Sequence, residues 1–177
     1  MTPILERPAH RVWLLGQATG LIDMFRAVTG GPAGFRMLGH DGRPMFGDDE
    51  VFGIHDTTRI VHVFSLATQM GIPGLRDGID QGIEFLWRAF RDTTHGGYHW
   101  SVNAEGPVRA DKQAYGHAFV LLAASSALRI GHPRARALLD DITTVMEERF
   151  WEDGPGAMAE EFEADWREIG PYRGQNS

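Results

Sequence analysis

The strongest constraint on the fold of this chain is an internal repeat. The order of helix-closing and helix-opening residues recurs with a period of roughly 55–60 residues, which is the length of one pair of helices. The matching segments are Gly71-Ile72-Pro73 with Gly131-His132-Pro133, Phe90-Arg91-Asp92 with Phe150-Trp151-Glu152, and His62-Val63-Phe64 with His117-Ala118-Phe119. A helix-pair repeat of this length predicts stacked αα-hairpins, wound either as a solenoid or as a closed toroid.

Apolar periodicity predicts five helices, at about 9–28, 53–70, 73–91, 111–130 and 133–150. We expect Asp111 to cap the fourth helix and Pro73 and Pro133 to lie in the first turns of the third and fifth helices. The fourth helix is apolar around most of its circumference, which predicts burial on nearly all sides.

The segments between these helices contain turn signals typical of short β-ribbons. One ribbon is expected within 33–50, around Asp41-Gly42, and a second within 93–106, where paired glycines precede alternating aromatic residues. A Gly/Pro-containing loop at 152–156 leads into 158–166. The predicted fold class is therefore all-α with short ribbons in the loops between helices.

Composition narrows the classes of partner. The 177 residues suffice for one domain with a sizeable core, and a net charge of −7 argues against nucleic-acid binding. The absence of cysteine excludes disulfides, thiolate metal sites and cysteine nucleophiles. The first residues lack the layout of a signal peptide, and the longest apolar run, 118–124, is far shorter than the ~20 residues that span a bilayer. We expect a soluble, cytoplasmic protein without a membrane partner.

Three polar residues stand near the starts of predicted inner helices: Arg59, Tyr115 and Asn176. In a toroid they would converge on one end, where helix N-termini carry partial positive charge that favours an anionic intermediate. The alternative for each residue alone is structural, with Arg59 paired to a carboxylate and Tyr115 bonded to a loop. Their common placement near helix starts favours a binding site.

Other polar residues have simpler interpretations. His62 and His117 lie on largely apolar helices and are expected to be core histidines. His95 and His99 lack a third ligand at a suitable interval, so no metal or other cofactor is predicted. An acidic cluster, formed by Glu160, Glu161, Glu163 and Asp165, is either a solvated face or a source of one carboxylate that contacts sugar hydroxyls or orients Arg59.

Two tryptophans and the absence of hydrolase motifs constrain the function only weakly. Trp100 and Trp166 each precede an inner helix and suit either packing or stacking on a sugar ring. Sequence motifs of nucleotide, serine and zinc hydrolases are absent. Glycoside hydrolysis on an α/α toroid would need two positioned carboxylates, for which the acidic cluster offers one candidate at most.

Four segments resemble the N-acylglucosamine 2-epimerase family, and most closely its mannose isomerase-type members. They are Thr58-Arg59 through Ser65-Leu66-Ala67, Phe90-Arg91-Asp92 with His95-Gly96-Gly97-Tyr98-His99-Trp100, Lys112-Gln113-Ala114-Tyr115-Gly116-His117-Ala118-Phe119, and Asp165-Trp166 with Pro171-Tyr172-Arg173-Gly174-Gln175-Asn176. Each motif is moderately specific, whereas their order and spacing together are strongly so.

The resemblance implies an (α/α)6 barrel and cofactor-independent aldose–ketose isomerisation, with D-mannose and D-fructose as the leading pair. It implies proton abstraction beside the carbonyl, an enediolate, and reprotonation by histidine acid/base groups. It also implies that Arg59, Tyr115 and Asn176 contact the sugar, with Arg59 stabilising the oxyanion and the other two bonding hydroxyls. His55 stands where a sugar-facing tryptophan is expected. The alternatives are an N-acylhexosamine or disaccharide 2-epimerase and a non-catalytic helical module that binds sugar or protein.

The same resemblance implies that the chain covers about the first half of such a barrel. The acid/base histidines of the family would lie beyond residue 177, so we expect a truncated portion that is inactive alone. A half barrel would expose the flanks of its inner helices, which predicts self-association or poor solubility.

Overall fold

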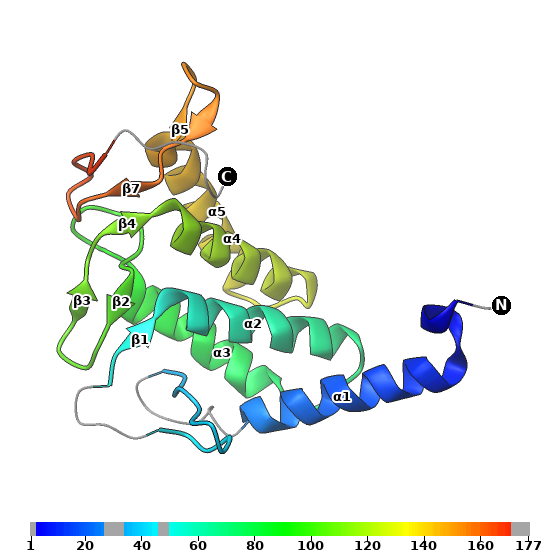
Figure 1. Cartoon of the computed structure of the whole chain (residues 1–177). Helices are drawn as coiled ribbons and strands as arrows, with labels where there is room; N and C mark the ends of the chain where they lie inside the picture. The colour runs from blue at the N-terminus through cyan, green and yellow to red at the C-terminus, as the bar shows by residue number, and fades with distance from the viewer. Residues whose placement is uncertain (1–2, 27–33, 46–49, 171–177) are drawn as a thin grey trace.

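A computed structural model of the protein describes residues 3–26, 34–45 and 50–170. Five α-helices dominate it, as the periodicity predicts (Figure 1). They follow a single 3-10 turn, Ile4–Glu6, and are α1 (Pro8–Arg26), α2 (Ile54–Gln69), α3 (Arg76–Phe85), α4 (Ala114–Arg129) and α5 (Ala135–Val145).

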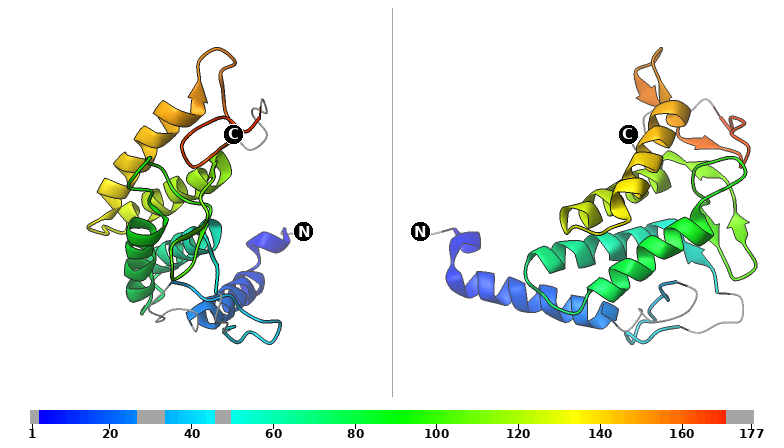
Figure 2. Two further views of the ribbon diagram at one scale, coloured as in Figure 1. Left: turned by 90° about the vertical axis from the view of Figure 1, so that its left-hand side faces the viewer. Right: turned by 180° about the vertical axis from the view of Figure 1, so that it is seen from behind.

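The helices are arranged as two αα-hairpins. α3 packs on α2, α5 packs on α4, and α2 lies along α4 (Figures 1 and 2). This confirms stacked helix pairs with α2 and α4 as the neighbouring inner helices. The core runs through both hairpins and contains fully buried Val61, Ile83, Leu138 and Phe150.

The structural repeat is 60 residues long, because α2 begins at Ile54 and α4 at Ala114. The glycine and phenylalanine matches keep this register. The match of His62 with His117 does not, and that part of the prediction was wrong. His117 lies in the first turn of α4, whereas His62 lies in the third turn of α2, so the two histidines have different surroundings.

Three predictions about helix starts were also wrong. Gln113 rather than Asp111 is the N-cap of α4, because 112–113 forms a strand. The Asp111 carboxylate instead accepts hydrogen bonds from Arg109 and Gln113. Pro73 and Pro133 lie in the links before α3 and α5 rather than within those helices, since the link after α2 must also bury Leu75.

Each outer helix ends in one π-helical turn, at Leu86–Phe90 and Met146–Phe150. In the first of these the Arg91 N–H bonds the Leu86 carbonyl at 3.0 Å. The wider turn carries Phe90 and Phe150 into the core, where both are fully buried. The predicted helix ends near 91 and 150 are therefore confirmed.

A short strand directly precedes each of the two inner helices. β1 (Phe52–Gly53) pairs with β2 (Ser101–Val102), which pairs with β3 (Pro107–Arg109). β4 (Lys112–Gln113) pairs with β7 (Glu161–Phe162). Because β1 runs into α2 and β4 runs into α4, both inner helices begin at one end of the molecule, which we call the ribbon end (Figure 1).

The segments between helices contain short ribbons. Around Asp41-Gly42 the described residues form the small ribbon expected there: Leu38 bridges Pro44, the Gly39 N–H donates to the Arg43 carbonyl, and the Met45 N–H donates to the Met37 carbonyl. The loop at 152–156 is the turn of a hairpin between β5 (Trp151–Glu152) and β6 (Ala157–Met158). The ribbon expected within 93–106 contributes β2, and its partner β3 begins just after the predicted turn.

Two helices are more exposed than expected. Of α1 only Ile22 is buried, and the N-terminal half of α1 extends beyond the two hairpins (Figures 1 and 2). Its exposed residues include Val12, Trp13 and Leu15. α4 is not buried on all sides either, because Leu122 is 37% exposed on the side turned away from α5 and the core. Among the described residues, no helix is long and apolar enough to cross a membrane.

Candidate functional site

The site predicted from the sequence maps to the open face of the inner helices. We define this face as Arg59, His62 and Val63 of α2 with Tyr115, Phe119 and Leu122 of α4, residues that share the least covered stripe of each helix. The spacing of three or four residues within each set keeps it on one side of its helix. The face begins at the ribbon end, at the N-termini of α2 and α4.

Arg59 and Tyr115 are in direct contact. The Arg59 Nη2 donates a hydrogen bond to the Tyr115 hydroxyl at 2.9 Å, and the guanidinium carbon lies 4.8 Å from the centre of the Phe119 ring. Arg59 is exposed, and no carboxylate among the described residues forms an ion pair with it. The structural alternative for Arg59, a carboxylate partner, is therefore not what the described residues show.

This arrangement leaves donors available. A guanidinium has five N–H groups, and the Tyr115 oxygen accepts from one of them. The phenol proton is thereby free to point elsewhere. Arg59 and Tyr115 together present a cationic, donor-rich edge beside two helix N-termini, which suits an oxygen that gains negative charge.

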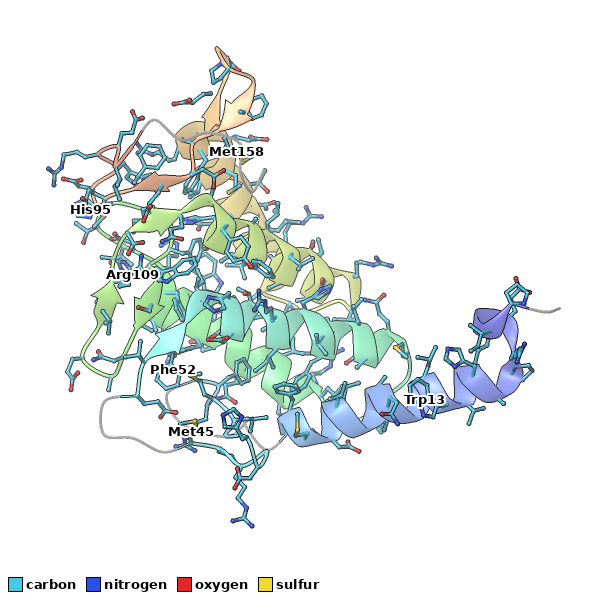
Figure 3. All side chains as sticks on the ribbon, in the orientation of Figure 1. Trp13, Met45, Phe52, His95, Arg109 and Met158 are labelled. Carbon is cyan, nitrogen blue, oxygen red and sulfur yellow. The ribbon has the colours of Figure 1, made fainter. Side chains whose placement is uncertain are left out.

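Aromatic rings frame the ribbon end of this face. The Tyr115 ring packs edge-on against Phe119 at 5.0 Å and lies 6.3 Å from Trp100. Trp100 also contacts His55 at 5.4 Å, and the Arg109 guanidinium lies over its ring at 5.5 Å. Figure 3 labels Arg109 at the ribbon end, close to the start of α4. His55, at the sequence position where the resemblance implied a tryptophan, is therefore in contact with another aromatic ring, that of Trp100.

The third predicted residue, Asn176, lies outside the described residues. Trp166, the other candidate for sugar stacking, packs instead against Phe150, Phe162 and His117, and its Nε1 donates to the His95 carbonyl at 2.8 Å. Within the acidic cluster Glu161 accepts from the Gln113 side chain, and Asp165 pairs with Arg167.

Behind the open face, the buried side chain of His117 has both ring nitrogens hydrogen-bonded within the protein. His117 is 1% exposed; its Nε2 accepts from the Tyr98 N–H at 3.0 Å, and its Nδ1 donates to the Gln113 carbonyl at 2.8 Å. Burial lowers the pKa of His117 to about 3, so the ring is neutral at pH 7. This confirms the prediction of a core histidine.

An ion pair lies in the same buried region. The Lys112 Nζ donates to Asp92 at 2.7 Å, and neither side chain reaches the surface appreciably. Burial opposes ionisation of Asp92, but bonds from Lys112, His95 and Thr94 outweigh it and lower the pKa of this carboxyl group. Among the described residues, no group of three or more His, Asp or Glu side chains is placed to hold a metal ion.

His62 differs from the prediction made for it. It is half-buried on the open face rather than in the core, and its Nδ1 lies 2.8 Å from the Ser126 hydroxyl of α4. The sequence carried a signal for this: His62 is three residues from Arg59 and four from Leu66, which places it in the exposed stripe of α2.

A pocket of about 400 Å³ adjoins the open face on the other flank of α2. Arg59 and Asp56 line it together with apolar residues of α1, α2 and the segment 35–38. Arg59 therefore both contacts Tyr115 and lines this cavity.

These observations define a class of protein: a helical-hairpin array with an arginine–tyrosine site at the N-termini of its inner helices. The N-acylglucosamine 2-epimerase (GlcNAc 2-epimerase) family model matches residues 33–177. The chain belongs to this family.

Three relatives sharpen the comparison. The chain is 44% identical over 173 residues to a D-mannose isomerase of Pseudomonas cannabina pv. alisalensis, covering 98% of this chain and 41% of that protein. It is 41% identical over 180 residues to a D-mannose isomerase of Thermobifida fusca, covering all of this chain and 43% of that one. A crystal structure of a D-mannose isomerase matches with a TM-score of 0.84 at 25% identity, over 99% of this chain and 44% of its own.

The chain thus spans less than half the length of these relatives. Its two hairpins correspond to part of an (α/α)6 barrel, which confirms the predicted fold class.

Proposed function

We propose that this chain carries the Arg59–Tyr115 part of a sugar isomerase site that interconverts D-mannose and D-fructose. The observation that supports it most directly is the hydrogen bond between Arg59 and Tyr115 at the N-termini of two inner helices, with no described carboxylate neutralising the arginine. The two D-mannose isomerase relatives at 44% and 41% identity favour this sugar pair.

The proposed chemistry is a proton transfer between neighbouring carbons. A base removes the proton on C2 of the open-chain aldose, the electron pair forms a C1–C2 double bond, and the carbonyl oxygen on C1 becomes the enediolate oxyanion. Transfer of the C2 hydroxyl proton to the C1 oxygen and return of the abstracted proton to C1 give the ketose, with a hydroxyl on C1 and the carbonyl on C2. Arg59 stabilises the oxyanion, while Tyr115 and Asn176 bond sugar hydroxyls.

We assign the acid and base of this reaction to none of the described residues. In this proposal the 177 residues are the N-terminal portion of one (α/α)6-barrel domain, and they bind the sugar without converting it. The cytoplasmic location also stays a prediction, which fractionation of the source cells would test.

Binding and turnover are tested on the same purified chain. Calorimetric titration with D-mannose and D-fructose is expected to show binding, and an assay for fructose formed from mannose is expected to show no turnover. Absence of binding to both sugars would overturn the proposal. Turnover would overturn the assignment of acid and base outside these residues.

An enediolate mimic separates an isomerase site from a module that merely binds sugar. D-arabinonohydroxamate is planar at its carbonyl carbon and nitrogen, which stand in for C2 and C1 of the enediolate, and an isomerase site binds such a mimic more tightly than the substrate. We expect tighter binding than D-mannose, with the excess lost in Arg59→Ala. Equal affinity would favour the non-catalytic module, and a preference for N-acetylmannosamine or cellobiose would favour a 2-epimerase.

Self-association through exposed helix flanks forms part of the same proposal. Val63 and Leu66 of α2, Met70 at the C-cap of α2 and Leu122 of α4 are exposed, as are most apolar residues of α1. Apolar surface of this extent is typical of an interface. Sedimentation equilibrium of the chain is expected to show concentration-dependent association, and a monomer at all concentrations would contradict it.

A further inference from the structure

His62 is a polar residue of the open face to which the proposed reaction assigns no role. It lies one helical turn beyond Arg59 on α2 and is half-buried. Its imidazole bridges the two inner helices, with Nδ1 at 2.8 Å from the Ser126 Oγ. The same Oγ lies 2.8 Å from the Leu122 carbonyl, to which it donates.

These two short contacts determine where the imidazole proton is. Ser126 has one hydroxyl proton, and the Leu122 carbonyl has none to give, so that proton must lie between Oγ and the carbonyl. The Oγ is then the acceptor of the other contact, and Nδ1 must carry the proton that it accepts. In the neutral ring Nε2 is consequently unprotonated and is a hydrogen-bond acceptor.

Nε2 has no partner among the described residues, and the ring is partly accessible from the open face. Burial lowers the pKa of His62, which keeps the ring neutral and Nε2 unprotonated at pH 7. His117 gives the contrast: its ring is in the same protonation state, but its Nε2 is occupied by the Tyr98 N–H.

The acceptor complements the rest of the face. Arg59 can only donate, and Tyr115 has its oxygen engaged by Arg59 and its proton to offer. A sugar hydroxyl both accepts and donates, so a face made only of donors leaves the hydroxyl proton unsatisfied. Residues three apart on a helix have Cβ atoms about 5–6 Å apart, which is the scale of a single sugar ring.

We propose that His62 is a sugar-positioning residue, whose Nε2 accepts a hydrogen bond from one hydroxyl group of the monosaccharide held by Arg59 and Tyr115. This rests on the proposed function, because it presupposes that a sugar binds to the open face. It adds a specificity element, since only sugars with a hydroxyl at the matching position satisfy Nε2.

The first experiment needs no sugar. Long-range ¹H–¹⁵N spectra of the full chain, labelled in histidine, report the tautomer of each ring, and His62→Gln assigns the signals of His62. The expected result at pH 7 is a neutral His62 protonated on Nδ1, with Ser126→Ala weakening that preference. A ring protonated on Nε2, or charged at pH 7, would overturn the proposal.

The second experiment identifies the hydroxyl. The 2-, 3-, 4- and 6-deoxy derivatives of D-mannose are titrated against the wild-type chain and against His62→Ala. For the wild type, one derivative is expected to bind roughly 3- to 10-fold more weakly than D-mannose, which is the range of one neutral hydrogen bond. For His62→Ala, the same derivative and D-mannose are expected to bind with equal affinity. A fold defect cannot imitate this pattern, since it would not select one hydroxyl.

Ser126→Ala retains the His62 imidazole but removes the hydroxyl that fixes its tautomer, and it replaces His62→Ala if that variant does not fold. In Ser126→Ala, the affinity difference between D-mannose and the same deoxy sugar is expected to be smaller than in the wild type. D-mannose binding that depends on Arg59 but shows no hydroxyl coupled to His62 would overturn this inference alone. No binding of D-mannose by the wild type would overturn the proposed function as well.

Discussion

Polar side chains in two neighbouring regions of this molecule differ in whether their hydrogen-bonding atoms are all bonded within the protein. Behind the open face, His117, Lys112 and Asp92 are buried and their hydrogen-bonding atoms are taken by other parts of the chain. On the open face, Arg59 and His62 each make a short contact across the two inner helices and keep further polar atoms available. Both regions lie in the same two helical hairpins.

Residue type therefore does not decide the role of a histidine in this protein. His62 of α2 and His117 of α4 share a tautomer, yet both nitrogens of His117 bond to the protein whereas only Nδ1 of His62 does. A polar group whose bonds are all internal stabilises the fold, and one with an atom left over can recognise a ligand. Substitutions in the two regions should therefore move different quantities.

The largest effect is expected from Lys112→Met. It leaves the Asp92 carboxylate buried without its ammonium partner, which costs about 3–5 kcal/mol of unfolding free energy. Urea unfolding measures this, and adding Asp92→Asn should recover part of the loss. The matched control is Arg109→Met, because the Arg109 side chain is 51% exposed in its pair with Asp111 and its loss should cost less than about 1 kcal/mol. Equal losses in both variants would contradict the distinction between the regions.

Acid should destabilise the protein through His117. Its folded-state pKa of about 3 lies below the ordinary value of 6.5, so between these values the unfolded chain binds a proton that the folded chain does not. The stabilising contribution is complete above pH 6.5 and falls by up to about 1.4 kcal/mol per pH unit as the pH drops toward 3.

Because other groups also titrate in this range, the quantity to measure is the difference between the wild type and His117→Gln. The unfolding free energy of the variant should fall less steeply between pH 6.5 and 4. Parallel pH curves for the two proteins would show that His117 is not held neutral by burial.

Arg59→Ala should act on binding and leave stability nearly intact. Losing a charged hydrogen bond to the ligand is worth about 1.5–3 kcal/mol, so the affinity for D-mannose should fall roughly 10- to 100-fold. Because Arg59 is exposed, the unfolding free energy should change by less than about 1 kcal/mol. Arg129→Ala, an equal change in charge at the far end of α4, should alter neither quantity.

The smallest effect is expected from Tyr115→Phe, which keeps the ring against Phe119 and removes the hydroxyl that accepts from Arg59. One lost neutral hydrogen bond predicts a roughly 2- to 10-fold weaker affinity for D-mannose. Calorimetry measures it, and unfolding should stay within about 0.5 kcal/mol of the wild type. An effect larger than that of Arg59→Ala would reverse the proposed order of the two residues.

Much of the fold could be predicted because it depends on local signals. Apolar periodicity placed five helices, and Gly71 and Gly131 marked the ends of both inner helices, where each takes a positive φ. The helix starts were predicted less well. Gln113 caps α4 because 112–113 pairs with 161–162, a contact between residues far apart in the sequence, which local capping rules do not include.

The candidate site was also predicted in part. The placement of Arg59 and Tyr115 near helix starts indicated that they would meet, and they do. The position of His62 was missed because its motif resembles that around His117. The two motifs are 55 residues apart in a repeat of 60, so their similarity does not reflect equivalent positions.

The repeat, the helices and the family can be predicted from the chain without a structure, because they follow from spacing and from residues that lie close together in the sequence. Which polar atoms are bonded within the protein and which stay available depends instead on how the helices pack. That outcome depends on how α2 lies against α4 and on the strands that fix where each helix begins. The bond from Arg59 to Tyr115 and that from His62 to Ser126 both join helices more than fifty residues apart, and no local pattern specifies such a contact.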